Sequence, residues 1–454
     1  MRRKKPVDML RGNLIINILR FAVPLIISGI LQLLFNAIDM IVVGKFSGSA
    51  SMAAVSSTGS LINLITNLFI GLSVGSSVCI ARRIGKGDTE EVSKAVHTSI
   101  SIAFISGIVL TFFGILFSRR LLIMMKSPED VIGLSTLYLR VYFTGMTATM
   151  VYNFASAILR AKGDTKRPLI ALSIAGMLNA LLNLFFVVVV KLDVAGVALA
   201  SSISSYVSAV LVLIVLISDP GMIQLDIRHL YIDKQALKDI ATVGIPAGIQ
   251  GTVFSLSNVA IQSSVNSFGR IVMAGNGAAS SIEGFVYNAM NAFYQTCLTF
   301  TSQNVGAGQL KRSGKILMAC TLMVILTGCI LGYGVYLNGE FFLGIYSDDM
   351  DVIAAGTIRL YYVCRLYFLC GIMDVFVGSL RGMGSSVLPM IVSLLGACAF
   401  RLVWIATYFQ THHDIQSLYV SYPYSWILTG CVHFLTILLV YVRLKRKMQY
   451  EKEL

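Results

Sequence analysis

One carboxylate stands apart in this sequence because it lies inside a long apolar segment. Residues 21–46 read FAVPLIISGILQLLFNAIDMIVVGKF, and Asp39 is the one carboxylate among them. About 20 apolar residues are enough to cross the hydrocarbon core of a bilayer. A charge at membrane depth is costly, so it usually faces a protein interior or a watery cavity and marks a pathway. Asp39 is therefore a candidate for a group that takes up and releases a proton.

Amide and hydroxyl side chains recur in the apolar segments that could surround Asp39. Asn36 precedes it by one helical turn, and Asn179 and Asn183 are four positions apart, so they share one helix face. The sixth apolar segment adds serines at positions 201, 202, 204 and 205, of which we assign Ser202 to the group. Carboxylate and amide oxygens also suit a hard cation such as Na⁺. We expect this group to bind H⁺ or Na⁺; the alternative is a buried aspartate that only caps or hydrogen-bonds a helix.

The second half of the chain offers a different set of charges at membrane depth. Glu283 and Asp374 are its carboxylate candidates, with Arg365 and Arg401 as their expected partners. These four residues could line a substrate or ion path, or they could form buried ion pairs that only fix helix packing. Arg359, like Arg140, lies nearer the end of a span, where its long side chain can reach the interface.

The composition fixes the class of protein. The chain has 454 residues, of which 56% are hydrophobic and only 13% charged, whereas a soluble protein carries about a quarter charged residues. This is an integral membrane protein. The start, MRRKK, is basic, but the first apolar run is too long for a cleavable signal peptide. The eight cysteines fall in apolar runs without a CxxC pair, which predicts reduced packing residues.

Apolar runs separated by turn and charge signals predict twelve membrane-spanning helices. They cover residues 14–44, 52–81, 95–117, 134–159, 168–190, 195–217, 238–266, 273–302, 315–338, 355–378, 387–410 and 418–442. The longest connection, SDPGMIQLDIRHLYIDKQ, follows the sixth span. We therefore expect an amino-terminal lobe at 1–217, a cytoplasmic linker at 218–237 and a carboxyl-terminal lobe at 238–454.

The net charge of +14 is carried mainly by short loops on one side of the predicted membrane. Lys and Arg gather with the amino terminus and at 82–94, 160–167, 228–238 and 311–315, while acidic residues cluster on the other side at 348–351. Cytoplasmic loops carry this excess of Lys and Arg, so both termini are expected in the cytoplasm and the protein in the plasma membrane. Nucleic acid is not needed to explain the charge.

The two halves of the chain repeat each other. ILRAKGDTKRPLI (158–170) matches SLRGMGSSVLPMI (379–391), and IGKGDTEEVSK (84–94) matches VGAGQLKRSGK (305–315), both at a shift of 221 residues. Six spans per half is an even number, so the halves are parallel repeats related by an axis along the membrane normal. The predicted fold is thus an all-α membrane protein of two six-helix bundles that enclose a cavity and rock to alternate access.

Prolines and glycines punctuate both repeats at equivalent places. Pro24 in the first span corresponds to Pro246 in the seventh, and both could act as hinges because neighbouring groups can satisfy the freed backbone atoms. The Gly-x-Gly loops at 85–87 and 306–308 lack the GxxxxGK[ST] pattern of a phosphate-binding loop. We interpret them as tight cytoplasmic turns.

With these motifs in hand, the sequence resembles the multidrug and toxic compound extrusion (MATE) family of the multidrug/oligosaccharidyl-lipid/polysaccharide exporter superfamily. The resemblance covers all twelve spans and rests on the proline-containing first span with Asp39, on QNVGAGQLKR (303–312), and on MDVFVGSLRGMGS (373–385). It implies two six-helix lobes, a V-shaped central cleft, and efflux of cationic amphipathic compounds in exchange for H⁺ or Na⁺.

The resemblance also assigns site residues. The ion site in the amino-terminal lobe of one branch carries over onto Asp39, Asn179 and Asn183, although many members of that branch have a second aspartate where Asn183 stands. Asp374 matches a tenth-span carboxylate of another branch, whose seventh-span glutamate has no equivalent here between Ile245 and Phe268. The sequence combines features of both branches.

We therefore expect a secondary antiporter that needs no cofactor and exports a small molecule such as an organic cation. A flippase for lipid-linked precursors is the main alternative, but it would need a strongly basic cavity, and Arg365 and Arg401 are expected to be balanced by Glu283 and Asp374. A membrane-embedded enzyme would need a convergent catalytic set, which the sequence does not offer. Membrane lipids are expected partners, and two lobes in one chain make a monomer sufficient.

Overall fold

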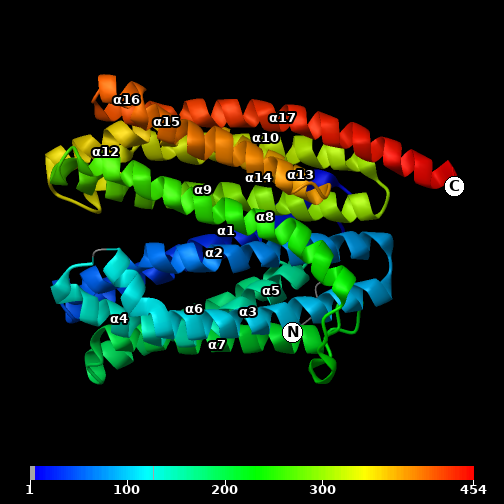
Figure 1. The fold of residues 1–454 in the computed structure, drawn as a ribbon, viewed down its shortest axis with the longest axis horizontal. Coiled ribbons are helices and arrows are strands. Elements are labelled where there is room, and N and C mark those ends of the chain that lie inside the picture. The colour runs from blue at the N-terminus through cyan, green and yellow to red at the C-terminus, as the bar shows by residue number, and fades with distance from the viewer. Residues whose placement is uncertain (1–5, 126, 454) are drawn as a thin grey trace. The chain divides into compact units, whose positions relative to one another are not determined.

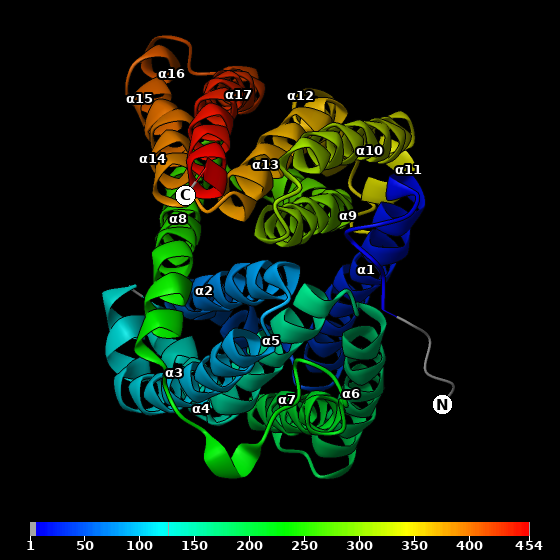
Figure 2. The same cartoon turned by 90° about the vertical axis from the view of Figure 1, so that its right-hand side faces the viewer.

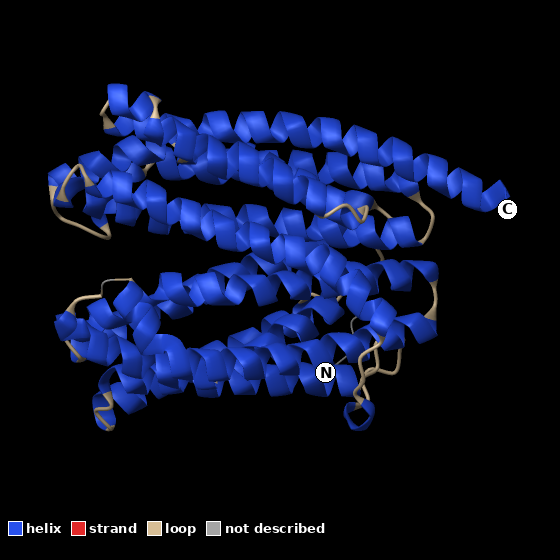
Figure 3. Cartoon of the chain, viewed as in Figure 1, coloured by secondary structure: helices blue, strands red, loops and turns tan. Residues whose placement is uncertain are grey.

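The computed structural model describes residues 6–125 and 127–453 of the chain. All regular structure in this part of the chain is helical (Figure 3). The first half of the chain forms the helices α1 (Leu14–Phe46), α2 (Ser49–Lys86), α3 (Thr89–Met124), α4 (Glu129–Thr144), α5 (Met146–Lys162), α6 (Lys166–Leu184) and α7 (Asp193–Ile217) (Figure 1). A π-helical turn, Phe185–Val189, continues α6.

The second half repeats this order with more interruptions. Its helices are α8 (Lys234–Asn266), α9 (Arg270–Gly306), α10 (Leu310–Leu337), α11 (Gly339–Gly344), α12 (Met350–Tyr362), α13 (Tyr367–Gly382), α14 (Val387–Ser393), α15 (Phe400–Ala406), α16 (Tyr408–Thr411) and α17 (Ile415–Glu453). A 3₁₀ turn, Cys364–Leu366, joins α12 to α13, and a π-helical segment, Leu394–Ala399, joins α14 to α15.

Each of the twelve predicted spans coincides with a helix or with a helix that is locally interrupted. In the described part of the chain, ten helical segments are long and apolar enough to cross a membrane. The fourth predicted span is divided between α4 and α5 at Gly145, and the eighth, α9, carries many polar side chains. Helices such as α17 run well beyond the predicted span, because an apolar pattern marks only the part of a helix that lies in hydrocarbon.

The chain forms two compact units, and the helices α1 and α8 are each shared between them. Unit 1 holds Ile27–Gly248, whereas unit 2 holds Asp8–Ile26 together with the residues from Ile249 onward. Each division falls two residues after a proline, Pro24 in α1 and Pro246 in α8. The predicted hinge residues therefore lie where one helix passes from one compact unit to the other.

The predicted linker is tied to unit 1 by contacts with α3. The backbone N–H of Asp226 donates to Nε2 of His97 at 3.2 Å, and that of Asp233 donates to the Thr98 hydroxyl at 2.9 Å. The Tyr231 ring stacks on the His97 ring with centroids 5.5 Å apart. His97 is thus a buried residue that anchors this connection, which Figure 2 shows running from α7 to α8.

Glycines allow the first half of α8 to pack directly on α2 within unit 1. A Cβ atom on Gly71 would lie 2.2 Å from the backbone nitrogen of Gly248, and one on Gly75 would lie 2.2 Å from the carbonyl oxygen of Ile240. Gly244 and Gly248 flank Pro246 in the sequence GIPAG, and Gly71 and Gly75 belong to GLSVG. Small residues four apart let membrane helices approach until their backbones touch.

Candidate ion-coupling site

Asp39 and three other polar side chains of unit 1 form a closed ring of hydrogen bonds. Asn183 donates from Nδ2 to Asp39 Oδ1, and the Ser201 hydroxyl donates to Asp39 Oδ2 at 3.4 Å. Asn183 Nδ2 also donates to Asn179 Oδ1 at 3.2 Å. Asn179 Nδ2 closes the ring by donating to Ser201 Oγ at 3.3 Å. The ring joins three helices, α1, α6 and α7.

The chemistry of Asp39 sets the orientation of Asn183. An ionised carboxylate only accepts hydrogen bonds, so the amide must present its NH₂ group to it. Its carbonyl oxygen, Oδ1, is then left buried without a donor among the residues that the structure describes. Buried polar atoms are usually hydrogen-bonded, so an open acceptor next to a carboxylate points to a proton or a cation as its partner.

Local structure holds the two asparagines in place. Asn179 and Asn183 face the same side of α6 because residues four apart lie one above the other on a helix. The π-helical turn Phe185–Val189 begins two residues later, a kind of bulge that often occurs at functional sites. Both amides are buried, and Asn183 has no exposed surface at all. Asp39 itself is half-buried.

Two residues that the sequence analysis assigned to this site lie elsewhere. Asn36 is exposed on α1 and makes no hydrogen bond within the described ranges. The Ser202 hydroxyl turns to α4, where it donates to the carbonyl of Val141 at 3.0 Å. Successive helical residues are rotated by about 100°, so only one of two adjacent serines can face Asp39. That serine is Ser201, and the assignment of Ser202 was wrong.

In unit 2, Glu283 pairs with a different arginine from those expected. Both carboxylate oxygens accept from Arg359, at 3.0 Å from Nε and 2.8 Å from Nη2. Arg359 also donates to Asn276 Oδ1 at 2.7 Å. Glu283 is 3% exposed and Arg359 8% exposed, so Arg359 does not reach the interface as the sequence analysis expected. This satisfied pair supports the alternative that Glu283 fixes helix packing.

The arginines expected as partners are held by aromatic rings instead. Arg401 donates from Nε to the Ser425 hydroxyl at 2.8 Å, and its guanidinium carbon lies 4.2 Å from the centroid of the Tyr422 ring. Arg365 lies over the Tyr361 ring at 4.1 Å. Neither arginine forms an ion pair with a carboxylate in the described part of the chain. The expectation that Glu283 balances them was wrong.

Asp374, the other predicted carboxylate, lies half-buried on α13. The groups that act on it electrostatically are the Tyr287 hydroxyl from α9 and the Arg381 guanidinium from its own helix. Arg381 is buried and donates to the Tyr294 hydroxyl at 2.6 Å and to Gln250 Oε1 at 2.8 Å. The structure therefore brings Asp374 near Arg381, and among the described residues Asp374 forms no ion pair with Arg365 or Arg401.

None of the residues in the described ranges forms a group of three or more His, Cys, Asp or Glu side chains that could hold a metal ion. The groups around Asp39 are instead neutral amides and hydroxyls, and their oxygens suit a proton or a monovalent hard cation.

Comparison with known proteins decides the family. A family model described as MatE matches residues 24–185 and, a second time, residues 246–407. The chain belongs to the MatE family. The double match confirms the internal repeat, because each half of the chain fits the MatE model once. It also confirms the resemblance that the sequence motifs indicated.

Relatives and solved structures agree with this assignment. The chain is 27% identical over 411 residues to the probable multidrug resistance protein YoeA of Bacillus subtilis, covering 89% of each chain. It is 22% identical to a protein of Shewanella oneidensis named FAD transporter, covering 91% of this chain and 92% of that one. A crystal structure of MATE in complex with MaL6 matches with a TM-score of 0.91 at 21% identity, covering 98% of this chain and 100% of that chain.

MatE proteins are transporters, so the ring around Asp39 belongs to a multi-pass membrane transporter and not to an enzyme. Asp39, Asn179 and Asn183 could be predicted because a lone charge and an i,i+4 pair are visible in the sequence itself. Asn276 and Gln250 were not predicted, and Arg359 was expected at the interface, because their partners come from other helices and no spacing in the sequence marks them.

Proposed function

We propose that this MatE protein is a secondary active antiporter that exports cationic amphipathic compounds across the plasma membrane in exchange for H⁺ or Na⁺. The observation that carries the proposal is the hydrogen-bonded ring at Asp39, a single carboxylate at membrane depth beside an open carbonyl oxygen. The predicted orientation, with both termini in the cytoplasm, follows from the distribution of Lys and Arg.

The ring offers a way to couple ion binding to a change of conformation. In the ionised state Asp39 accepts from Asn183 and Ser201. A proton on Asp39 turns one of these acceptors into a donor, which needs a new acceptor, and Asn183 Oδ1 is the open one. A Na⁺ ion would instead draw the same oxygens around itself. Either event requires the Asn183 amide to turn and the ring to rearrange.

Rearrangement of the ring acts on a helix that both units share. Asp39 lies in the part of α1 that belongs to unit 1, whereas the part before Ile27 belongs to unit 2. An ion favours one conformation only by the difference between its affinities for the two states. Bending at Pro24 would let α1 follow the ring while its first turns stay with unit 2.

The test measures transport of a fluorescent organic cation by the protein in inside-out vesicles. A proton gradient and a Na⁺ gradient are imposed separately. We expect the wild-type protein to transport under one gradient and Asp39→Asn to lose that transport. Asp348→Asn, the same chemical change in an exposed loop, serves as the matched control and keeps wild-type activity. Equal transport by Asp39→Asn and wild type would refute the role of Asp39 and leave Asp374 as the next group to test.

A second candidate function is export of an anionic amphipathic metabolite or a lipid-linked precursor. Arg365 and Arg401 have no carboxylate partner in the described part of the chain, so the second lobe is more basic than the sequence analysis expected. The relative from Shewanella oneidensis is named an FAD transporter. If vesicles export FAD but no organic cation, and Arg365→Gln with Arg401→Gln abolishes that export, this second function replaces the first.

A further inference from the structure

A basic pocket lies at the end of unit 2 where the sequence predicts the cytoplasm. It has a volume of about 530 Å³ and lies between the loop before α10, the first turns of α10, and the end of α17. Lys311, Arg312, Lys315 and Lys445 line it, together with Tyr441 and Met448. None of the residues that line it is acidic.

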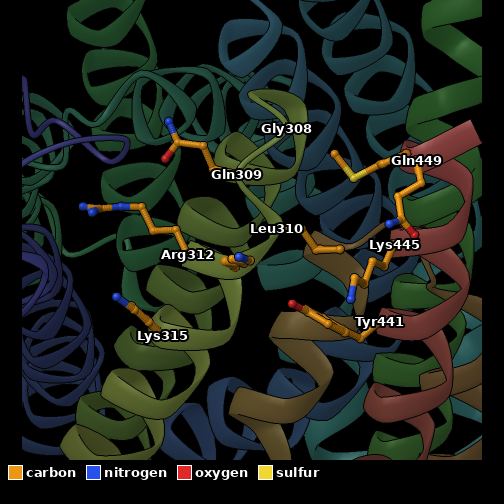
Figure 4. A pocket seen from close by; sticks show the side chains of 10 residues that line it. Gly308, Gln309, Leu310, Arg312, Lys315, Tyr441, Lys445 and Gln449 are labelled. Atoms are coloured by element: carbon orange, nitrogen blue, oxygen red, sulfur yellow. The ribbon is translucent and has the colours of Figure 1, made fainter. Parts of the chain in front are cut away.

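The arrangement of these side chains brings positive charge from two helices to one place. Lys311 and Lys315 are four residues apart on α10, so they share one face of that helix. Figure 4 shows Lys445 and Tyr441 extending from α17 towards the first turn of α10, whereas Arg312 and Lys315 extend from the side of α10 that faces away from α17. Arg312 also donates from Nη2 to the carbonyl of Gly12 at 3.3 Å, which fixes its position.

The equivalent position in the first repeat has the opposite charge. In the alignment of 84–94 with 305–315, Glu90 corresponds to Lys311 and Glu91 to Arg312. In unit 1 those glutamates bind Lys94 at 2.8 Å and 3.1 Å, so the cation of that loop has its partners within the chain. In unit 2 the equivalent cation is Lys315, and the positions that match Glu90 and Glu91 hold Lys311 and Arg312. Lys315 forms no ion pair with any described residue.

The backbone at this end of α10 is also open to an anion. The residue before α10, Gln309, makes no side-chain capping hydrogen bond, whereas Asp88 caps the equivalent helix α3 by accepting from the N–H of Glu91 at 3.0 Å. The first N–H groups of a helix have no acceptor within it and attract negative charge. The N–H of Arg312 already donates to the carbonyl of Gln309 at 3.0 Å, so the N–H groups of Leu310 and Lys311 are the ones left for an anion beside the cations of the pocket.

The surroundings indicate a lipid as the source of the anion. On the membrane side of the pocket, α10 exposes Met318 (75%) and Leu322 (50%), and α17 exposes Leu438 (50%) and Val442 (47%). The contact between the two helices is apolar, since Leu317 of α10 and Tyr441 of α17 pack against a buried cluster that includes Leu380 of α13. A free phosphate would have no use for these apolar faces, whereas the acyl chains of a lipid would cover them.

We propose that this pocket binds the phosphate head group of an anionic membrane lipid, with the acyl chains along α10 and α17. Basic pockets between transmembrane helices on the cytoplasmic side bind such head groups. Lys311, Lys315 and Lys445 supply the charge, Arg312 closes one edge, and Tyr441 offers a hydroxyl donor. The first repeat cannot bind a lipid in this way because Glu90 and Glu91 neutralise its loop.

Native mass spectrometry of the purified full-length protein tests the proposal. Phosphatidylglycerol is added against an equal amount of phosphatidylcholine, and inorganic phosphate is added as a competitor in a separate arm. We expect retention of phosphatidylglycerol, little retention of phosphatidylcholine, and no displacement by inorganic phosphate. Equal retention of the two lipids overturns the proposal, and displacement by inorganic phosphate shows a site for free phosphate instead.

Variants locate the binding. Each cation near a membrane surface contributes about fivefold in affinity, so removing three with Lys311→Gln, Arg312→Gln and Lys445→Gln weakens phosphatidylglycerol binding about a hundredfold. The matched control Arg228→Gln, Lys234→Gln and Lys238→Gln removes three exposed cations from unit 1 and keeps binding. Lys311→Glu with Arg312→Glu, which copies the charges of the first repeat, abolishes it. Equal losses in the pocket variant and the control mean that net charge alone attracts the lipid.

Discussion

Asn183, a fully buried amide on α6, donates a hydrogen bond to Asp39, the one carboxylate of α1. The same NH₂ group also donates to Asn179, one turn earlier on α6. One side chain therefore connects the candidate coupling group to a second helix and leaves its own carbonyl oxygen open.

Replacing Asn183 by Ala removes the donor to Asp39 and the open carbonyl together. A hydrogen bond to a charged group contributes about 1.5–3 kcal/mol, so its loss should change ion affinity by about tenfold to a hundredfold. The affinity for a proton should rise, because the ionised carboxylate loses a donor, whereas the affinity for Na⁺ should fall, because the ion loses an oxygen ligand. The measurement is the concentration of coupling ion that gives half-maximal export. Asn36→Ala, on the exposed face of α1, keeps the wild-type value. If both variants behave alike, the ring does not bind the ion.

Ser201 and Ser202 are expected to differ although they are neighbours. Ser201→Ala removes a neutral donor from Asp39, which costs about 0.5–1.5 kcal/mol and shifts the ion dependence of export several-fold. Ser202→Ala removes the bond to Val141 and lowers the melting temperature without changing the ion dependence. A shift in ion dependence with Ser202→Ala alone would reverse the assignment.

The pair of Glu283 and Arg359 is expected to stabilise the fold and not to couple ions. Breaking a buried ion pair by removing one partner costs about 3–5 kcal/mol, so Glu283→Gln and Arg359→Gln each lower the melting temperature in detergent. The double variant leaves no unpaired charge and should be more stable than either single variant. Vesicles with equal amounts of folded protein should keep the ion dependence of wild type. A single variant that folds normally but loses coupling would contradict this role.

The contact between α2 and α8 should not tolerate a methyl group. Gly71→Ala places a Cβ 2.2 Å from the backbone of Gly248, so the helices must separate, at a cost of about 1–3 kcal/mol or more. Gly59→Ala lies on the same helix with no atom within 4 Å of the new Cβ and serves as the control. The melting temperature checks both, and equal values for the two variants would show that this crossing is loose.

Acid should release the turn that follows α7. The His229 ring and the backbone N–H of Arg228 both bind the Asp226 carboxylate, and they lower the pKa of Asp226 below its ordinary value of 3.8. A carboxyl group with a lowered pKa contributes stability above its ordinary pKa, and this is lost as pH falls through the lowered value. We expect pepsin to cleave the turn only in that acid range, and His229→Ala to move cleavage to higher pH. Cleavage that is independent of His229 would exclude this link.

The helices could be predicted well because the length and the apolar character of each one are visible in its own residues. Apolar runs separated by turn and charge signals located all twelve spans, and the i,i+4 spacing of Asn179 and Asn183 placed both on one face of their helix. Rotation about a helix axis is harder to predict, as the exchange of Ser202 for Ser201 shows. A pattern of apolar residues shows which face of a helix points inward, but it does not decide between two adjacent residues at the edge of that face.

Partners across helices were the least predictable feature. Glu283 and Arg359 are 76 positions apart, and nothing in their spacing distinguishes Arg359 from Arg365. The glycine contact between α2 and α8 could have been found, since GLSVG and GIPAG both carry glycines four apart in apolar segments. The basic pocket could also have been found, by comparing the charges of the two repeats position by position.

The sharing of α1 between the two units sets an order for synthesis of the protein. Asp8–Ile26 leave the ribosome before Ile27–Gly248, but the rest of their own unit begins only at Ile249. These residues must therefore wait in the membrane while the whole of unit 1 is made, and unit 1 is itself complete only when Gly248 has emerged. Neither unit can finish folding before α8 is inserted into the membrane. Insertion of α8 is therefore the step on which assembly of both units depends.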